Sequence, residues 1–266
     1  MADFLQSVKD AVKQTPLWPI LRPRRIHLYG IGAPRTGTLS LRRLFGYYRT
    51  GFEVHLDTTV DLIRSQLSDE RLRNRLRRRD RRARFESEVA YYLVYLCQAL
   101  ALEFPQAKFI CTVRPPRRWL RSIVNKCINS PREKLPKEYR FLRDYSFGQI
   151  PEHYPSEEAV LEKYSLHSLD GYLSYWAFHF QTVLDAIPSS RRLLLRTKSL
   201  SSASEQIADF VGIPESRLCG EQSHAHRTSE KHGVLDEIDE DYLGAKIETH
   251  CQEVADRLRQ NSQISL

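Results

Sequence analysis

Cysteine is sparse and shows no paired spacing in this sequence of 266 residues. The cysteines are Cys97, Cys111, Cys127, Cys219 and Cys251, an odd number with no CxxC pair. This pattern excludes a disulfide framework and the usual zinc-site spacings, and no metal is expected. We predict reduced thiols that pack in the core, in a protein of the reducing cytoplasmic compartment.

Long hydrophobic runs are also missing. No apolar run approaches the roughly 20 residues that a helix needs to span a bilayer. Met1–Pro16 is charged and lacks the apolar core of a signal peptide. Within residues 1–25 we therefore expect a short amphipathic helix followed by a basic lead-in. That helix either packs on the domain, which we favour, or contacts a membrane surface.

Acidic residues are outnumbered by basic ones, 33 to 41, which gives a formal net charge of +8. This imbalance favours an anionic partner without identifying it. A phosphorylated cofactor, a sulfated glycan, a nucleic acid and a lipid surface all have the required charge. No nucleic-acid-binding motif is recognisable, so a nucleic acid is not expected as the partner.

Strands and helices alternate along the chain. Buried strands are predicted at Ile26–Gly32, Phe52–Leu56, Ala107–Val113 and Arg192–Arg196. Helices are predicted at residues 38–47, 59–85, 88–104, 116–128, 157–186, 201–211 and 238–258. This alternation indicates an α/β fold with a mainly parallel sheet and helices on both faces, in one domain over residues 1–266. Residues 129–156 are rich in proline, glycine and charge, and predict an irregular lid or substrate loop.

A glycine-containing loop, Gly32–Gly37, follows the first predicted strand and opens into a helix. Backbone N–H groups of such a loop converge on one point, which suits a phosphate. The glycine spacing is that of a Walker A loop, but Thr38 stands where that motif requires lysine. The cation is Arg35, inside the loop. This pattern argues against ATP or GTP hydrolysis and leaves a plain tight turn as the alternative.

The loop and a second motif together resemble one enzyme family. PRTGTLSL resembles the 5′-phosphosulfate loop of sulfotransferases that use 3′-phosphoadenosine-5′-phosphosulfate (PAPS). Arg114, the two prolines after it and Ser122 match the spacing of the family's 3′-phosphate element. The resemblance implies a three-layer, P-loop-like fold and PAPS as cofactor without a metal. It also implies a donor site at Pro34, Arg35, Thr36, Gly37, Thr38, Leu39, Ser40, Arg114 and Ser122.

The resemblance continues less specifically to Lys231. Trp176–His179 and the strand Arg192–Arg196 are similar to family segments. Residues 226–231 occupy the place of a basic loop that covers the cofactor, which makes Arg227 and Lys231 candidates for the 3′-phosphate. This segment departs from the Arg-Lys-Gly pattern of the animal cytosolic enzymes, so the assignment rests on position.

Sulfuryl transfer needs a charge that stabilises the leaving phosphate and a base that accepts the acceptor's proton. Arg35 suits the first task. For the base, Glu53 and His55 lie two apart in a predicted strand and should project from one face. We favour His55, because imidazole titrates near neutral pH, over Glu53, which needs a raised pKa. His179, expected to be a packed histidine, is a weaker candidate, as are His224 and His226.

The segment from Arg64 to Arg84 is unusually rich in arginine. Four of these arginines fall on one helical face: Arg71, Arg75, Arg78 and Arg82. This face is either simply solvated or an anion-recruiting wall beside the acceptor site.

The sequence as a whole predicts an O-sulfotransferase that transfers a sulfuryl group to a hydroxyl of a small-molecule or carbohydrate acceptor, one that could itself be anionic. A nucleotide or small-molecule kinase of the same fold is one alternative. A catalytically silent, anion-binding scaffold is the other.

Overall fold

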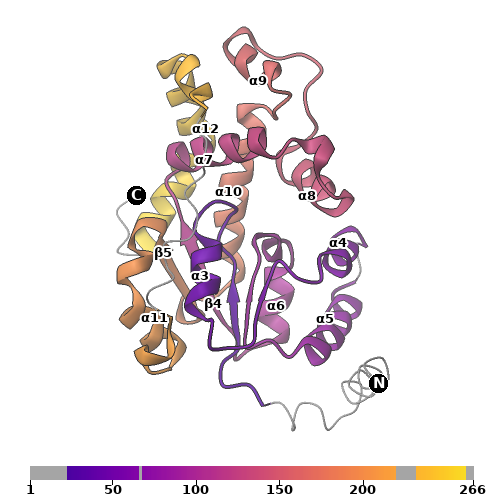
Figure 1. Cartoon of the computed structure of the whole chain (residues 1–266), viewed down its shortest axis with the longest axis vertical. Helices are drawn as coiled ribbons and strands as arrows, with labels where there is room; N and C mark the ends of the chain where they lie inside the picture. Colours follow the sequence, from indigo (N-terminus) through magenta and orange to yellow (C-terminus); the bar gives the residue numbers. More distant parts are fainter. Residues whose placement is uncertain (1–22, 66–67, 220–231, 262–266) are drawn as a thin grey trace.

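The computed structural model describes residues 23–65, 68–219 and 232–261 (Figure 1). Five strands form one sheet in the order β2-β3-β1-β4-β5, and every neighbouring pair is parallel. The strands are β1 (Leu28–Gly30), β2 (Thr50–Phe52), β3 (Ser87–Val89), β4 (Lys108–Val113) and β5 (Arg192–Arg196). The predicted parallel sheet is therefore confirmed, with one strand more than the sequence suggested.

Helices occupy most of the connections between strands. They are α3 (Thr38–Leu44), α4 (Leu56–Arg64), α5 (Asp69–Ala83), α6 (Cys97–Glu103), α7 (Pro116–Asn129), α8 (Lys137–Phe147), α9 (Ala159–Lys163), α10 (Leu169–Ala186), α11 (Ser204–Val211) and α12 (Glu240–Asn261). In the described part of the chain, no helix is long and apolar enough to cross a membrane.

The sheet is covered on both faces, because successive side chains of a strand point to opposite sides. Phe109 and Cys111 of β4 belong to the larger core, which also contains residues of α6, α7, α10 and α12. Ile110, between them, belongs to a second core with residues of α3 and α11, such as Leu41 and Ile207. The predicted three-layer α/β fold is confirmed.

Several predicted boundaries were wrong. Residues 59–85 form two helices, α4 and α5, and the acidic Asp69 and Glu70 favour a new helix start. The long helix expected from residue 157 begins only at Leu169, after Ser168, whose hydroxyl accepts a hydrogen bond from Gly171 N (3.1 Å). Residues 129–156, expected to be irregular, contain α8.

The missed strand β3 has one acidic residue just before it, Glu86, and one within it, Glu88, and its second half was predicted to begin a helix at residue 88. Both are buried and paired with arginine. Glu86 lies 3.0 Å from Arg25, and Glu88 accepts a hydrogen bond from Arg79 at 2.8 Å. Because these charges are neutralised locally, a polar segment can occupy a buried position in the sheet.

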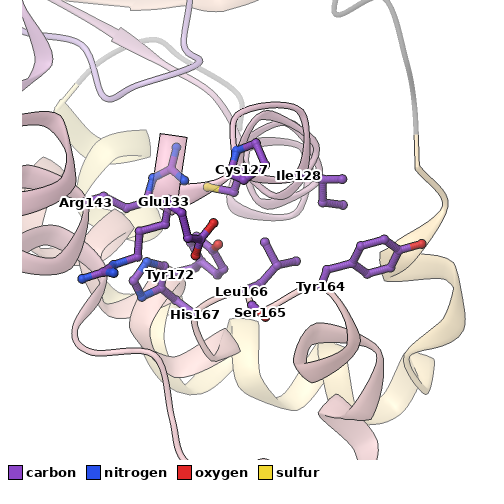
Figure 2. Close-up of a pocket in the computed structure, with 11 residues that line it drawn as sticks. Cys127, Ile128, Glu133, Arg143, Tyr164, Ser165, Leu166, His167 and Tyr172 are labelled. Atoms are coloured by element: carbon purple, nitrogen blue, oxygen red, sulfur yellow. The ribbon is translucent and has the colours of Figure 1, made fainter. Parts of the chain in front are cut away.

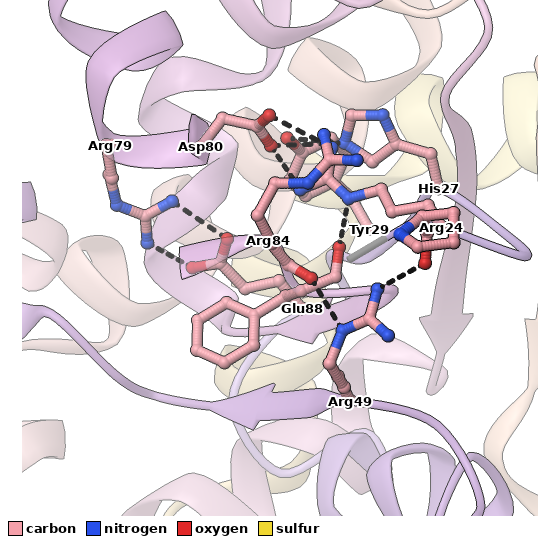
Figure 3. Close-up of polar contacts among 10 residues, drawn as sticks. Arg24, His27, Tyr29, Arg49, Arg79, Asp80, Arg84 and Glu88 are labelled. Atoms are coloured by element: carbon pink, nitrogen blue, oxygen red, sulfur yellow. Dashed lines mark hydrogen bonds and ion pairs between the residues drawn. The ribbon is translucent and has the colours of Figure 1, made fainter. Parts of the chain in front are cut away.

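Buried ion pairs also attach the arginine-rich helix α5 to the rest of the fold (Figure 3). Arg79 faces Glu88, and the neighbouring Asp80 accepts a hydrogen bond from Arg24 at 2.9 Å. The opposite face of α5, with Arg71, Arg75, Arg78 and Arg82, is exposed. Asp80 is therefore engaged inside the fold and does not neutralise that exposed face.

Candidate active site

The two predicted phosphate elements open from the same edge of the sheet. The chain leaves β1 toward β2 and β3 on one side, whereas it leaves β4 toward β5 on the other. Ligands of open parallel sheets bind at such a switch point, beyond the carboxyl ends of the strands. The loop Gly32–Gly37 follows β1, and Arg114 follows β4.

The loop after β1 is held in an unusual conformation. Gly37 (φ 99°), which precedes α3, and Arg35 (φ 68°) are both left-handed. Gly32 packs so closely that an added Cβ would lie 2.0 Å from Thr112 Oγ1. Only glycine fits there, because the loop passes directly over β4.

Side chains from three other segments fix this loop. The Thr36 hydroxyl is hydrogen-bonded to Ala33 O (2.7 Å) and to the Thr112 hydroxyl of β4 (2.8 Å). Trp119 Nε1 of α7 donates to Pro34 O (2.8 Å). Thr197 Oγ1, after β5, donates to Thr36 O (2.6 Å). The loop is therefore rigidly positioned before any ligand binds.

A cavity of about 810 Å³ lies over the loop and the end of β4. Its wall combines residues of the loop, the end of β2, the end of β4, α7 and α8. The polar side chains of this wall include Arg35, Glu53, Tyr91, Arg114, Lys126, Ser130, Tyr139, Arg143 and Thr197.

Most of the predicted donor-site residues meet in this cavity. Its wall includes Pro34, Arg35, Gly37, Thr38, Leu39, Ser40 and Arg114. Thr36 is fully buried and its hydroxyl is used to hold the loop, so only its backbone can serve a ligand. Ser122 is not part of the wall, but its hydroxyl accepts a hydrogen bond from Arg35 Nε (3.3 Å). Arg227 and Lys231 lie outside the described residues.

The surroundings of Arg114 favour the binding of an anion. Its backbone is fixed by Trp176 Nε1, which donates to Arg114 O (3.0 Å). Its guanidinium is partly buried, and within the described ranges no carboxylate forms an ion pair with it. Burial, and then the nearby charge of Arg35, lower the pKa of Arg114. Burial also lowers the pKa of Arg35. A bound anion would relieve both effects.

The predicted strand Phe52–Leu56 is wrong. β2 ends at Phe52, and Glu53 (φ 47°) and His55 (φ 53°) both adopt left-handed conformations. The two side chains therefore do not share one strand face. Glu53 lines the cavity, whereas His55 is exposed at the start of α4, beside the ring of Phe85 at 5.9 Å between centroids.

Glu53 is a partly buried carboxylate at the cavity wall. Its Oε2 accepts a hydrogen bond from the Tyr139 hydroxyl at 3.0 Å. Burial raises the pKa of Glu53, although the bond from Tyr139 and the charge of Lys126 oppose the increase. The pKa of His55 is lowered, because its exposed side chain is still partly shielded from solvent and because the charge of Arg79 is near.

His179 is a packed core histidine, as expected. It is fully buried, its Nε2 lies 2.8 Å from Ile31 O, and its Nδ1 lies 3.1 Å from the Tyr175 hydroxyl. Burial lowers its pKa to about 4. The other two weaker candidates, His224 and His226, lie outside the described residues.

Several cavity residues were not identified from the sequence, among them Lys126, Tyr139, Arg143 and Thr197. A signal existed only for Lys126, which lies one helical turn after Ser122 and so on the same face of α7. Tyr139 and Arg143 belong to α8, in the segment expected to be irregular. Thr197 reaches the loop only because β4 and β5 are neighbours in the sheet.

A smaller cavity of about 150 Å³ adjoins the first, and Cys127 and Arg143 contribute to both walls (Figure 2). His167 and Tyr172 are buried beside it, and their ring nitrogens and hydroxyl form no hydrogen bond of normal geometry to any described residue. Burial lowers the pKa of His167 to about 4. The cavity has room for several waters at about 30 Å³ each.

A metal is not suggested by the arrangement of side chains. In residues 23–65, 68–219 and 232–261, no cluster of three or more histidine, cysteine, aspartate or glutamate side chains could hold a metal ion. The cavity instead presents cations and backbone N–H groups, which suit phosphate and sulfate oxygens.

A model of the sulfotransferase domain matches residues 28–217, more than half of the chain. The chain therefore belongs to the sulfotransferase domain family. No curated protein sequence matches it significantly.

Solved sulfotransferases share the fold at low sequence identity. The sulfotransferase of Alicyclobacillus acidocaldarius is 17% identical, with a TM-score of 0.52, and the match covers 91% of this chain and 97% of that one. The sulfotransferase STF9 of Mycobacterium avium is 13% identical, with a TM-score of 0.56, and the match covers 96% and 81%. At identities this low, the comparison shows a shared fold and nothing more specific.

Proposed function

We propose that this chain transfers a sulfuryl group from PAPS to a hydroxyl of a small-molecule or carbohydrate acceptor. The observation that carries the proposal is one cavity in which the loop with Arg35, the guanidinium of Arg114 and the carboxylate Glu53 face the same space. The five free thiols, four of them buried, support a reducing cytoplasmic setting for this reaction.

The donor would lie across the switch point of the sheet. Loop N–H groups, Arg35 and the hydroxyls of Thr38 and Ser40 would hold its 5′ end, and Arg114 with Ser122 would hold its 3′-phosphate. In the described part of the chain Arg114 has no ion pair with a carboxylate, which supports this fit, because a partly buried guanidinium is stabilised by an anion. Arg227 and Lys231 remain predicted contacts to the 3′-phosphate.

Arg35 and Glu53 would perform the chemistry. Negative charge develops on the leaving phosphate, and the preorganised Arg35 and loop amides stabilise it without rearrangement. Glu53 would accept the proton of the acceptor hydroxyl. Its raised pKa makes it a better base than an ordinary carboxylate, and it faces the cavity, whereas His55 does not. We therefore assign the base to Glu53 and not to His55.

The two alternatives differ from this proposal in ligand and in turnover. A kinase of this fold would need a cation at position 38, where the chain has threonine. A silent scaffold would bind the nucleotide without needing Glu53.

Two measurements separate the three functions. Adenosine 3′,5′-bisphosphate (PAP) should raise the melting temperature without metal, whereas stabilisation by ATP with Mg²⁺ alone would indicate a kinase. Incubation with ³⁵S-labelled PAPS and a panel of hydroxylated acceptors should then produce a labelled sulfate ester. PAP binding without transfer to any acceptor would support the scaffold.

A further inference from the structure

Two further cations line the cavity on the walls formed by α7 and α8. Lys126 Nζ donates to Ser130 Oγ (2.9 Å), and Arg143 Nη1 donates to Ser130 O (2.8 Å). Both side chains therefore converge on one residue, Ser130, which also lines the cavity. In the described part of the chain, neither cation forms an ion pair with a carboxylate.

Two of the acidic residues nearby, Asp144 and Glu53, are already engaged, whereas Glu133 lines the smaller cavity that Arg143 also lines. Asp144, next to Arg143 in α8, accepts a hydrogen bond from Arg132 Nε at 2.7 Å. Among the described residues that line the cavity, Glu53 is the single carboxylate, and it accepts a hydrogen bond from Tyr139. The described wall thus carries four cations, Arg35, Arg114, Lys126 and Arg143, against one anion.

Lys126 stands beside the proposed donor site but farther along α7. It lies four residues after Ser122, so it stands one turn farther along α7. Burial, and then the charges of Arg35 and Arg143, lower the pKa of Lys126, whereas the charge of Glu53 opposes the decrease. Lys126 is therefore within electrostatic reach of Arg35, of Arg143 and of the proposed base Glu53.

Lys126 is exposed and Arg143 half-buried, and the two like charges around one serine repel each other, so a bound anion would stabilise both. The donor's anionic groups are matched by the loop and Arg114 if the proposed function holds. The remaining cations therefore suit the acceptor. We infer that Lys126 and Arg143 bind an anionic group of the acceptor, which carries a carboxylate or a sulfate in addition to the hydroxyl that is modified.

The rest of this wall indicates what connects those two groups. Phe52, Tyr91, Tyr139 and Phe147 line the cavity beside the cations. Aromatic side chains pack well against rings and other flat apolar frameworks. The acceptor is thus a hydroxy acid or a hydroxylated sulfate ester with a ring between the two groups.

The test uses matched acceptor pairs and the PAP-loaded full-length protein. The carboxylate arm compares 4-hydroxybenzoate and 4-hydroxyphenylacetate with their methyl esters. The sulfate arm compares 4-hydroxyphenyl sulfate with 4-methoxyphenol. Calorimetry should show at least one anionic member binding about 10-fold or more tightly than its neutral counterpart, the range expected for charge-assisted hydrogen bonds. The arm that shows this preference identifies the anion.

Variants assign that preference to the two side chains. Lys126→Met and Arg143→Met should each abolish most of the preference, while Lys126→Arg and Arg143→Lys should retain much of it. Lys134→Met removes an exposed charge of the same segment outside the cavity and should change nothing. Arg143→Met also removes the hydrogen bond to the backbone carbonyl of Ser130. Lys126→Met leaves that bond in place, so it tests the preference with less change to the local structure.

The inference and the proposed function fail in different ways. If the wild-type protein does not bind PAP, the proposed function is wrong and the inference falls with it. If PAP binds but no anion in either arm binds more tightly than its neutral partner, only the inference is overturned. It is also overturned if Lys126→Met and Arg143→Met weaken PAP itself, or weaken anionic and neutral acceptors equally.

Discussion

Glu53 lies at the point where the short strand β2 ends and the chain turns in a left-handed conformation toward α4. This turn directs Glu53 to the cavity wall and leaves His55 outside it, exposed at the start of α4. The choice of base is therefore a consequence of two backbone conformations, which residue types alone do not specify.

Substitution at position 53 tests that choice. Glu53→Gln keeps the shape and removes the basic oxygen, so kcat should fall roughly 10²- to 10⁴-fold while PAP affinity stays near that of the wild type. In the wild type, kcat/KM should fall as Glu53 becomes protonated. This limb should lie above pH 4.5, because burial raises the pKa of Glu53. Steady-state kinetics across pH measures both effects.

His55→Ala is the matched control. Its side chain is exposed and not part of the cavity wall, so its loss should change kcat by less than about tenfold, below the range for a lost general base. A large loss in His55→Ala together with a small one in Glu53→Gln would return the base to His55.

At the scale of single residues, the motifs predicted more of the site than the periodicity did. Pro34, Arg35, Gly37, Thr38, Ser40 and Arg114 were placed by short motifs, and the structure brings them to one cavity. Tyr139 and Arg143 could not be placed, because they reach the site from α8, which is distant along the chain. Contacts of that kind depend on packing between elements.

At the scale of elements, the phosphate loop depends on hydroxyl groups that its own sequence does not contain. Thr197 follows β5, yet its hydroxyl donates to Thr36 O of the loop (2.6 Å) and also lies 3.1 Å from Val113 O of β4. One hydroxyl thus ties together the ends of three parallel strands.

Removing that hydroxyl should loosen the loop. Thr197→Val keeps the shape but leaves two carbonyl groups without their partner, at a cost of about 1–3 kcal/mol. We expect the melting temperature of the ligand-free protein to fall by several degrees, and PAP affinity to fall with it. Lys198→Ala, at an exposed neighbouring position, should change neither. Unchanged melting of Thr197→Val would show that the hydroxyl does not fix the loop.

The secondary-structure prediction was wrong where charged residues are buried and where a predicted helix is interrupted. β3 was predicted as part of a helix, because Glu86 and Glu88 interrupt the apolar pattern that indicates a buried strand. In the structure Arg25 and Arg79 neutralise these two carboxylates, so the strand can be buried. By contrast β5 was predicted with its observed bounds, since an apolar run between basic residues is a plain strand signal.

At the scale of the whole molecule, three buried histidines should make stability depend on pH. Burial lowers the pKa values of His27, His167 and His179 to about 4 each. The unfolded chain takes up these protons near pH 6.5, whereas the folded chain does not until about pH 4. The free energy of unfolding should therefore decrease as pH falls from 6.5 to 4, although the raised pKa of Glu53 opposes this.

Urea unfolding at several pH values measures this decrease. His167→Phe should reduce it, because phenylalanine fills the same aromatic site beside Phe147 and Tyr172 without binding a proton. A free energy of unfolding that stays constant or rises between pH 6.5 and 4.5 would contradict the account of these buried histidines.

The central claim is that one cavity holds a nucleotide with phosphates at both ends of its ribose, and calorimetric titration with PAP tests it without knowledge of the acceptor. The account predicts one PAP per chain in the absence of metal. Arg114→Ala should weaken binding about 10- to 150-fold, the loss expected for a charge-assisted contact to phosphate. Arg121→Ala, which removes an exposed arginine paired with Asp236, should bind like the wild type. No PAP binding by the wild type, or equal affinity in Arg114→Ala, would contradict the claim.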